Sequence, residues 1–262
     1  MNKQTLILVI IFLYVFVKGV IIEPNSLEVV KYQLQDSELK GIKIAFLTDF
    51  HLKRNDYKRL DKIINLTNEQ KPDVVLLGGD FAKGQNIKNT MNPDLLAQKL
   101  KFLNAPTYGV LGNHDWWSDG IGFFEAFKRN NIKILENSST RIILNGKYVD
   151  IIGFADYTTR TVNMSKAFIK TNNPRIVISH NPDVYFDILN TVNLILAGHT
   201  HGGQVVLPFI KATIVPSKYG SSFANGLVEK TKNKMIISKG LGTSILPIRY
   251  NCKPEITIVE FI

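Results

Sequence analysis

All five histidines of this chain follow short apolar runs, in the company of acidic and amide side chains. The histidines are His51, His114, His180, His199 and His201, and Asp49, Asp80, Asn113 and Asp115 lie at the same places. Imidazole, carboxylate and amide oxygen without sulfur suit Mn, Fe or Zn ions. A lone histidine at such a place is usually structural, but five of five indicate a metal site.

Seven ligands drawn from these nine residues are too many for one ion. Two ions roughly 3.5–4 Å apart that share Asp80 as a bridge would use all of them. Such pairs catalyse in-line displacement at phosphorus, because they hold phosphate oxygens and lower the pKa of a bridging water. The pattern therefore predicts a phosphoester or pyrophosphate hydrolase.

Composition limits the other classes of site. Cys252 is the only cysteine, so neither an intramolecular disulfide nor a thiolate metal cluster can form. The formal net charge is +10, which suits an anionic partner such as a phosphorylated substrate or an anionic bilayer. Because the lysines are scattered, we expect a solvated basic surface and no specific nucleic-acid site.

The elements that must position the candidates alternate along the chain. Apolar runs at 42–49, 73–80, 108–115, 175–181 and 193–201 predict buried strands. Helical patterns separate them, including one opened by Asn92-Pro93 as cap and first residue. Asn145-Gly146 and Asn225-Gly226 predict hairpin turns. We expect an α/β fold of two mixed sheets with helices outside, over residues 41–262.

The N-terminus differs from the rest. The run Leu6–Val17 is unbroken, and Lys18 is the only charge within residues 4–22. With Lys18 at the interface this segment reaches bilayer length, and no small-residue cleavage site follows. We expect residues 1–22 to be an uncleaved signal-anchor and residues 23–40 an extended linker. Lys3 and Lys18 flank the segment on both sides, so the side of the membrane is not decided.

The blocks Asp49-x-His51, Gly79-Asp80, Gly112-Asn113-His114-Asp115, His180 and Gly198-His199-Thr200-His201 resemble, in this order, the calcineurin-like metallophosphoesterases. The resemblance implies a four-layer αββα sandwich with a dinuclear centre at the strand ends. One ion would be held by Asp49, His51, Asp80 and His201. The other would be held by Asp80, Asn113, His180 and His199.

The same resemblance implies roles for two further residues. His114 would lie near the leaving group and stabilise the transition state or protonate the leaving oxygen, and Asp115 would orient it. The second block continues as Phe81-Ala82 where many members have Asn after a few residues, a departure that touches no ligand.

The Gln204 that follows the last block and the stretches 240–244 and 247–249 resemble a membrane-associated bacterial branch. That branch includes proteins similar to UDP-2,3-diacylglucosamine pyrophosphatases of lipid A synthesis, alongside relatives of broad phosphodiesterase activity. This implies a lipid-nucleotide substrate and attachment to the bacterial inner or cell membrane. Arg249 would either reach a substrate phosphate or be an ordinary surface arginine. The apolar segment Val205–Val215 would line a lipid pocket or enter the interface, or else belong to the core.

Two alternatives remain at this point. One is a phosphodiesterase or phosphatase of broad specificity. The other is a metal-binding scaffold without catalysis, which we disfavour because no ligand position is lost.

Overall fold

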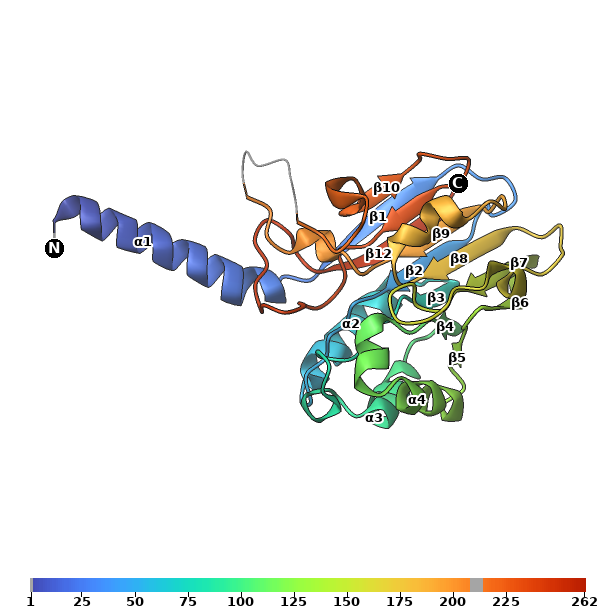
Figure 1. The fold of residues 1–262 in the computed structure, drawn as a ribbon, viewed down its shortest axis with the longest axis horizontal. Coiled ribbons are helices and arrows are strands. Elements are labelled where there is room, and N and C mark those ends of the chain that lie inside the picture. The colour runs from blue at the N-terminus through green and yellow to red at the C-terminus, as the bar shows by residue number, and fades with distance from the viewer. Residues whose placement is uncertain (1, 208–213) are drawn as a thin grey trace.

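The computed structural model describes residues 2–207 and 214–262. It contains two six-stranded mixed sheets that pack face to face (Figure 1). The first has the order β1-β12-β2-β3-β4-β5 and the second β10-β11-β9-β8-β7-β6. The bounds of the strands are β1 Glu28–Leu34, β2 Lys43–Leu47, β3 Val74–Leu77, β4 Thr107–Gly109, β5 Lys133–Ile134, β6 Ser138–Leu144, β7 Lys147–Gly153, β8 Arg175–Ser179, β9 Leu194–Ala197, β10 Gly226–Val228, β11 Met235–Ile237 and β12 Glu255–Phe261.

Helices cover the outer faces of both sheets and complete the four layers. They are α2 Tyr57–Glu69, α3 Pro93–Leu100, α4 Asn113–Arg129 and the short α5 Met164–Ala167, with 3-10 turns at Pro182–Asp187 and Gly220–Phe223. Apolar side chains of α2, α3 and α4 pack on the outer face of the first sheet, and a separate cluster fills the space between the two sheets. A third cluster lies under the 3-10 turns on the second sheet. The expected αββα sandwich is confirmed.

The strongest local sequence signals, which are apolar runs, a helix cap and an Asn-Gly turn, correctly predicted secondary structure. Four of the five apolar runs contain β2, β3, β8 and β9, whereas the run 108–115 overlaps only the end of β4 and then the start of α4. The side chain of Asn92 accepts hydrogen bonds from the backbone of Asp94 and Leu95 at 3.0 and 3.1 Å, which caps α3 as expected. Asn145-Gly146 forms the turn between β6 and β7, which pair antiparallel.

Two segments differ from the expectation. Residues 23–40, expected as a linker, contain β1, which pairs in parallel along its whole length with β12 and so belongs to the first sheet. Asn225-Gly226 is not a hairpin turn. It leads from the 3-10 turn into β10, and the hairpin to β11 closes through residues 229–234.

The N-terminal helix α1, Lys3–Val17, projects away from the body (Figure 1). It continues through a π-helical turn, Lys18–Ile22, and a 3-10 turn, Glu23–Asn25. None of its side chains is buried. By length and composition the 23-residue segment Lys3–Asn25 is able to cross a membrane, a test that a signal sequence would also pass.

The four sandwich strands that feed the candidate site run parallel in pairs. β2 pairs in parallel with β3 in the first sheet, and β8 pairs in parallel with β9 in the second. Their carboxyl ends meet at one edge of the sandwich, because residues that follow β2, β3, β8 and β9 hydrogen-bond one another. For example, the backbone of His199 donates to the Asp49 carboxylate at 3.1 Å, and His180 Nδ1 lies 2.8 Å from the carbonyl of Gly78, so residues of the two sheets contact each other.

Candidate metal centre

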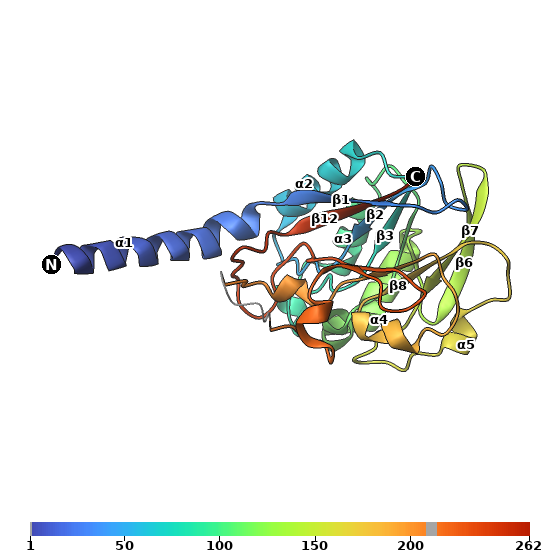
Figure 2. The ribbon, with the colours of Figure 1, turned by 90° about the horizontal axis from the view of Figure 1, so that it is seen from above.

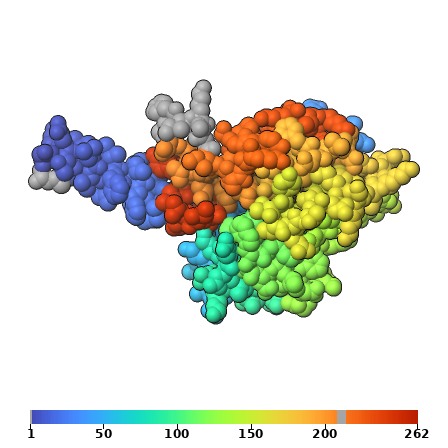
Figure 3. All heavy atoms as spheres, in the orientation of Figure 1, coloured from blue at the N-terminus to red at the C-terminus, as the bar shows by residue number. Residues whose placement is uncertain are grey.

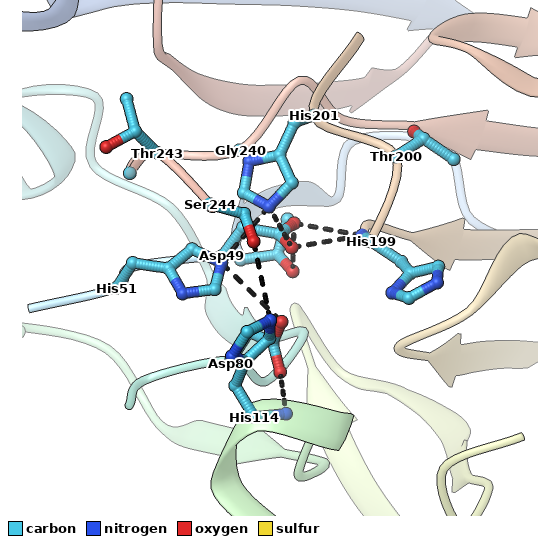
Figure 4. Close-up of polar contacts among 12 residues, drawn as sticks. Asp49, His51, Asp80, His114, His199, Thr200, His201, Gly240, Thr243 and Ser244 are labelled. Carbon is cyan, nitrogen blue, oxygen red and sulfur yellow. Dashed lines mark hydrogen bonds and ion pairs between the residues drawn. The ribbon is translucent and has the colours of Figure 1, made fainter. Parts of the chain in front are cut away.

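The structure brings the seven candidate ligands to one buried place at this edge. Three groups of side chains have ligand atoms that all lie within 4.8 Å of one another: Asp49, His51 and His201; His51, Asp80 and His114; and Asp80, His180 and His199. Figure 4 shows Asp49, His51, Asp80, His199 and His201 around a common centre. Asn113 joins the third group, because its Oδ1 lies 3.1 Å from His180 Nε2.

Asp80 stands between the two halves of this cluster. Its Oδ2 lies 3.5 Å from His51 Nε2 and 3.4 Å from His180 Nε2. Its Oδ1 accepts a hydrogen bond from the backbone of His114 at 2.8 Å. One carboxylate therefore contacts imidazoles from both sheets.

Three of the imidazoles have one ring nitrogen that points into the cluster, and two of these rings are held by a carbonyl on the other side. His51 Nδ1 lies 2.9 Å from the carbonyl of Ala82, and His180 Nδ1 lies 2.8 Å from the carbonyl of Gly78. A carbonyl can only accept, so both Nδ1 atoms carry protons and each Nε2 faces the centre. His201 Nδ1 has no hydrogen-bond partner among the described residues, and its Nε2 faces the centre as well.

The nitrogen and oxygen lone pairs that converge in the centre repel one another unless a positive charge lies between them. His51 Nε2 lies 3.1 Å from His201 Nε2, which in turn lies 3.3 Å from Asp49 Oδ1. His180 Nε2 faces an amide oxygen and a carboxylate oxygen. Lone pairs that converge in this way, without sulfur, fit divalent ions of the Mn, Fe or Zn type.

The pKa values of the site follow from burial and from these neighbours. Burial lowers the pKa of His51 to about 3 and that of His199 to about 3, which keeps both rings neutral and able to bind a cation. Burial raises the pKa of Asp49 to about 6. Burial also opposes the charged forms of His180 and Asp80, but their mutual attraction wins. This attraction raises the pKa of His180 well above its ordinary value and holds the pKa of Asp80 below its ordinary value.

The backbone at the site is strained. Twelve described residues other than glycine have positive φ, and they include Asp49, His51, Asp80, His199 and His201, with φ between 43° and 72°. Each such conformation costs about 1–3 kcal/mol and persists only where the surroundings enforce it. Here it turns side chains at the strand ends toward a shared centre.

Two glycines allow the close approach of neighbouring loops. A Cβ on Gly112 would overlap the Asp80 carboxylate and crowd the ring of His180. Gly240 has a φ of +71°, and a Cβ there would lie 2.6 Å from the Cβ of Asp49. A side chain at either position would displace a candidate ligand.

His114 lies at the mouth of the centre. Its ring packs edge-on against His51 with a centroid distance of 4.8 Å and against Trp117 at 5.1 Å. Its Nε2 lies 3.4 Å from the hydroxyl of Ser244, and its Nδ1 has no partner among the described residues. The sequence reasoning missed Trp117, although its helical spacing from His114 is a signal that could have indicated it. Nothing in the sequence places Ser244 there by spacing, because 130 residues separate it from His114.

Asp115 does not orient His114, contrary to the expectation. Its Oδ2 accepts hydrogen bonds from the backbone of Asp80 and Gly112, and its Oδ1 from the backbone of Ala82, all at 2.9 Å. These three bonds hold the residues after β3 against the start of α4. Burial, together with Asp80, raises the pKa of Asp115 to about 7.

Arg249 does not reach a substrate phosphate, because it is fully buried. Its Nη1 donates to the carbonyl of Cys252, its Nη2 donates to those of Lys239, Gly240 and Gly242, and its Nε also donates to Gly242. It holds the loop that packs on Asp49. Of the apolar segment Val205–Val215, residues 208–213 lie outside the described residues.

Comparison with known proteins agrees with this geometry. The calcineurin-like phosphoesterase family model matches residues 42–203. The chain is 30% identical over 257 residues to the uncharacterized metallophosphoesterase YkuE of Bacillus subtilis, covering 90% of this chain and 86% of YkuE. It is 30% identical over 250 residues to the phosphodiesterase YaeI of Escherichia coli, covering 92% of this chain and 90% of YaeI.

Among solved structures, the NAD nucleotidase NadN of Haemophilus influenzae is similar in fold. The TM-score is 0.50 at 16% identity, over 76% of this chain and 45% of that chain. At this identity the likeness concerns the fold alone.

Proposed function

This chain belongs to the calcineurin-like phosphoesterase family and is a metal-dependent phosphoester hydrolase, and we propose that it cleaves phosphodiesters at a dinuclear centre. The observation that carries the proposal is the position of Asp80. One of its carboxylate oxygens lies within 3.5 Å of an imidazole nitrogen in each half of the cluster. A single acid placed in this way can bridge two ions.

The ligands divide between the halves of the cluster. We assign Asp49, His51, Asp80 and His201 to one ion, and Asp80, Asn113, His180 and His199 to the other. When bound, two such divalent ions supply Lewis-acid activation of a water and of the phosphate oxygens.

The chain's own residues then support the ligands, position the His114 ring and protonate the leaving oxygen. His114 is the half-buried ring at the mouth, held between His51 and Trp117. A group at this place can protonate the leaving oxygen or stabilise the charge that forms on it. Ser244 positions the ring through the contact to Nε2. Asp115 keeps the backbone of Asp80 and Gly112 together and so supports the ligands without touching the substrate.

The test compares isosteric variants on a soluble diester, methyl para-nitrophenyl phosphate. After loading with Mn, Fe or Zn, we expect wild-type turnover and loss of both bound metal and turnover in Asp80→Asn. Asp61→Asn is the matched control, because Asp61 lies on the surface in an ion pair with Lys99. Turnover in Asp80→Asn equal to that of the control would contradict the proposal. A loaded protein that turns over no diester or pyrophosphate would favour the scaffold alternative.

A narrower candidate substrate is UDP-2,3-diacylglucosamine, whose pyrophosphate bond would be cleaved to UMP and a lipid monophosphate. The apolar helix α1 supports it, because it would hold the enzyme beside a lipid substrate. The assay compares this lipid nucleotide with methyl para-nitrophenyl phosphate in detergent. Turnover of the lipid nucleotide no faster than that of the diester would leave a phosphodiesterase of broad specificity.

We also propose that α1 anchors the protein, uncleaved, in the bacterial cell membrane. All its side chains from Leu6 to Val17 are exposed and apolar, an arrangement that a bilayer stabilises and water does not. Membranes washed with alkaline carbonate should retain the protein, and its mass should include residues 1–22. A soluble protein that lacks these residues would show that the segment is a removed signal peptide.

A further inference from the structure

The helix α1 is fixed to the body by specific contacts at its base. Lys18 Nζ donates to Asn251 Oδ1 at 2.7 Å and lies 4.4 Å from the centre of the Tyr250 ring. The backbone of Arg249 donates to the carbonyl of Gly19 at 2.9 Å, and the backbone of Cys252 donates to the buried carboxylate of Glu23. The direction of α1 is therefore set relative to the segment 249–252.

The same segment holds the mouth of the metal centre. Tyr250 pairs with the backbone of Gln204 and Val206 through two bonds of 2.8 Å. The side chain of Gln204 in turn bonds the carbonyl of Ser244 at 2.9 Å and its backbone nitrogen at 2.8 Å. Because Ser244 contacts His114, a continuous series of contacts joins the base of α1 to the candidate catalytic ring.

Exposed aliphatic side chains surround this junction. We call them the apolar lip: Ile21 (55% exposed), Ile22 (53%), Val205 (40%), Leu207 (48%), Ile245 (92%) and Leu246 (59%). Figures 1 and 2 show that the segments around residues 205 and 245 lie at the end of the body where α1 leaves it, and Figure 3 shows red atoms of the C-terminal part beside the base of the helix. Ile245 and Leu246 directly follow Ser244.

A cationic cavity opens next to the base of α1. It has a volume of about 630 Å³ and lies between residues 24–27 and the start of α2, where Lys58, Arg59 and Lys62 line it together with one acid, Asp56. Cationic side chains beside an apolar surface match the anionic headgroups and the acyl region of a bilayer.

From these observations we propose that the apolar lip lies in the interface of an anionic bilayer and seats the mouth of the metal centre against the lipid headgroups. The occupant is the bilayer, since the lip is continuous with α1 and the contacts of Lys18, Gly19 and Glu23 keep both at one level. The substrate then carries its phosphoester on a lipid. This last step rests on the proposed function, whereas the position of the lip does not.

The position of the lip is tested with the full chain in nanodiscs of equal parts phosphatidylcholine and phosphatidylglycerol. Ile245→Cys is labelled with an environment-sensitive nitrobenzoxadiazole and exposed to doxyl-labelled lipids. Leu189→Cys is the matched control. It is an aliphatic residue that is 81% exposed, and it precedes β9, whereas His199 and His201 follow that strand. The native Cys252 is buried, and wild-type protein treated with the same label measures any reaction there.

We expect the label at position 245 to lose most of its emission to doxyl lipids and the label at 189 to keep nearly all of it. Equal quenching at both positions would overturn the docking surface. Turnover of methyl para-nitrophenyl phosphate in the same wild-type nanodiscs reports on the proposed function separately. Quenching without turnover would support the docking surface and contradict the proposed activity. Turnover without quenching would support the proposed activity and contradict the docking surface.

The lipid substrate is tested with the double variant Ile245→Ser/Leu246→Ser. Hexadecyl para-nitrophenyl phosphate lies in the bilayer and methyl para-nitrophenyl phosphate dissolves in water, and both release the same leaving group. We expect the variant to keep its turnover of the methyl ester and to lose at least half of its turnover of the hexadecyl ester in nanodiscs. An unchanged ratio of the two rates would overturn delivery from the bilayer.

Discussion

Replacing the buried Arg249 with methionine should destabilise the loop that packs on Asp49 and weaken metal binding. The guanidinium donates to four carbonyl groups, those of Lys239, Gly240, Gly242 and Cys252. The carbonyl of Gly240 also accepts from the backbone of Glu255 at 3.1 Å. The other three would lose the donor seen in the structure, while methionine would keep most of the apolar packing.

The magnitude follows from these three groups. A buried polar group that loses its partner costs about 1–3 kcal/mol, so the three together give about 3–5 kcal/mol at the lower end of that range. For a chain of this size that corresponds to a fall in Tm of roughly 10 °C. The freed loop also supports the metal centre, because Leu241 donates to the carbonyl of Thr48 at 3.0 Å and Gly242 to that of Asp49 at 2.6 Å. Bound metal should therefore fall together with Tm.

The assay measures Tm, bound metal and the kinetics of diester hydrolysis for Arg249→Met, for Arg249→Lys and for Arg54→Met. Arg54 is an exposed arginine and serves as the control. Lysine keeps the charge but not the fork of donors, so its Tm should lie between those of the other two. A variant Arg249→Met with normal Tm and metal content and a raised KM would refute the reasoning, because that is the behaviour of a side chain that binds substrate phosphate.

Three further predictions follow from the site and the lip. His114→Ala should lower kcat by about 10²–10⁴-fold, the usual contribution of a general acid, with bound metal unchanged; metal loss would instead make it a ligand. Asp115→Asn should lower Tm by several degrees and weaken metal binding, because at least one of three backbone N–H groups loses its acceptor; a change in kcat alone would restore its orienting role. Ile245→Asn should raise stability by about 1 kcal/mol in detergent, because it relieves a φ of +57°; an unchanged Tm would contradict this.

The metal centre was predictable because its signals are local. Apolar runs such as Val74–Leu77 form strands buried on both faces, and the polar residue that follows each run must lie at the strand's carboxyl end. Parallel neighbours bring those ends together. The resemblance of the ordered blocks to a known family then implied how the ligands divide between two ions, which spacing alone could not give.

The parts that were missed depend on distant partners. β1 mixes polar and apolar residues without a clear period of two, and it becomes a strand by pairing with β12, more than 200 residues away. Asn225-Gly226 has the composition of a turn, but a 3-10 turn comes before it in place of a strand. The sequence around Arg249 does not tell a buried arginine from an exposed one, because its acceptors are backbone carbonyls that any residue provides.

Backbone strain links the metal centre and the lip. Among the twelve described residues with positive φ, the Asp, Asn and His residues belong to types that tolerate this conformation. The five Asp and His residues all belong to the metal centre, where the cluster enforces the strain. Ile245 is the only β-branched residue among the twelve, and no ligand contact compensates it. Its conformation turns an apolar side chain fully outward beside Ser244. In water nothing offsets the cost of this backbone conformation, whereas at a bilayer the burial of the aliphatic side chain would offset it.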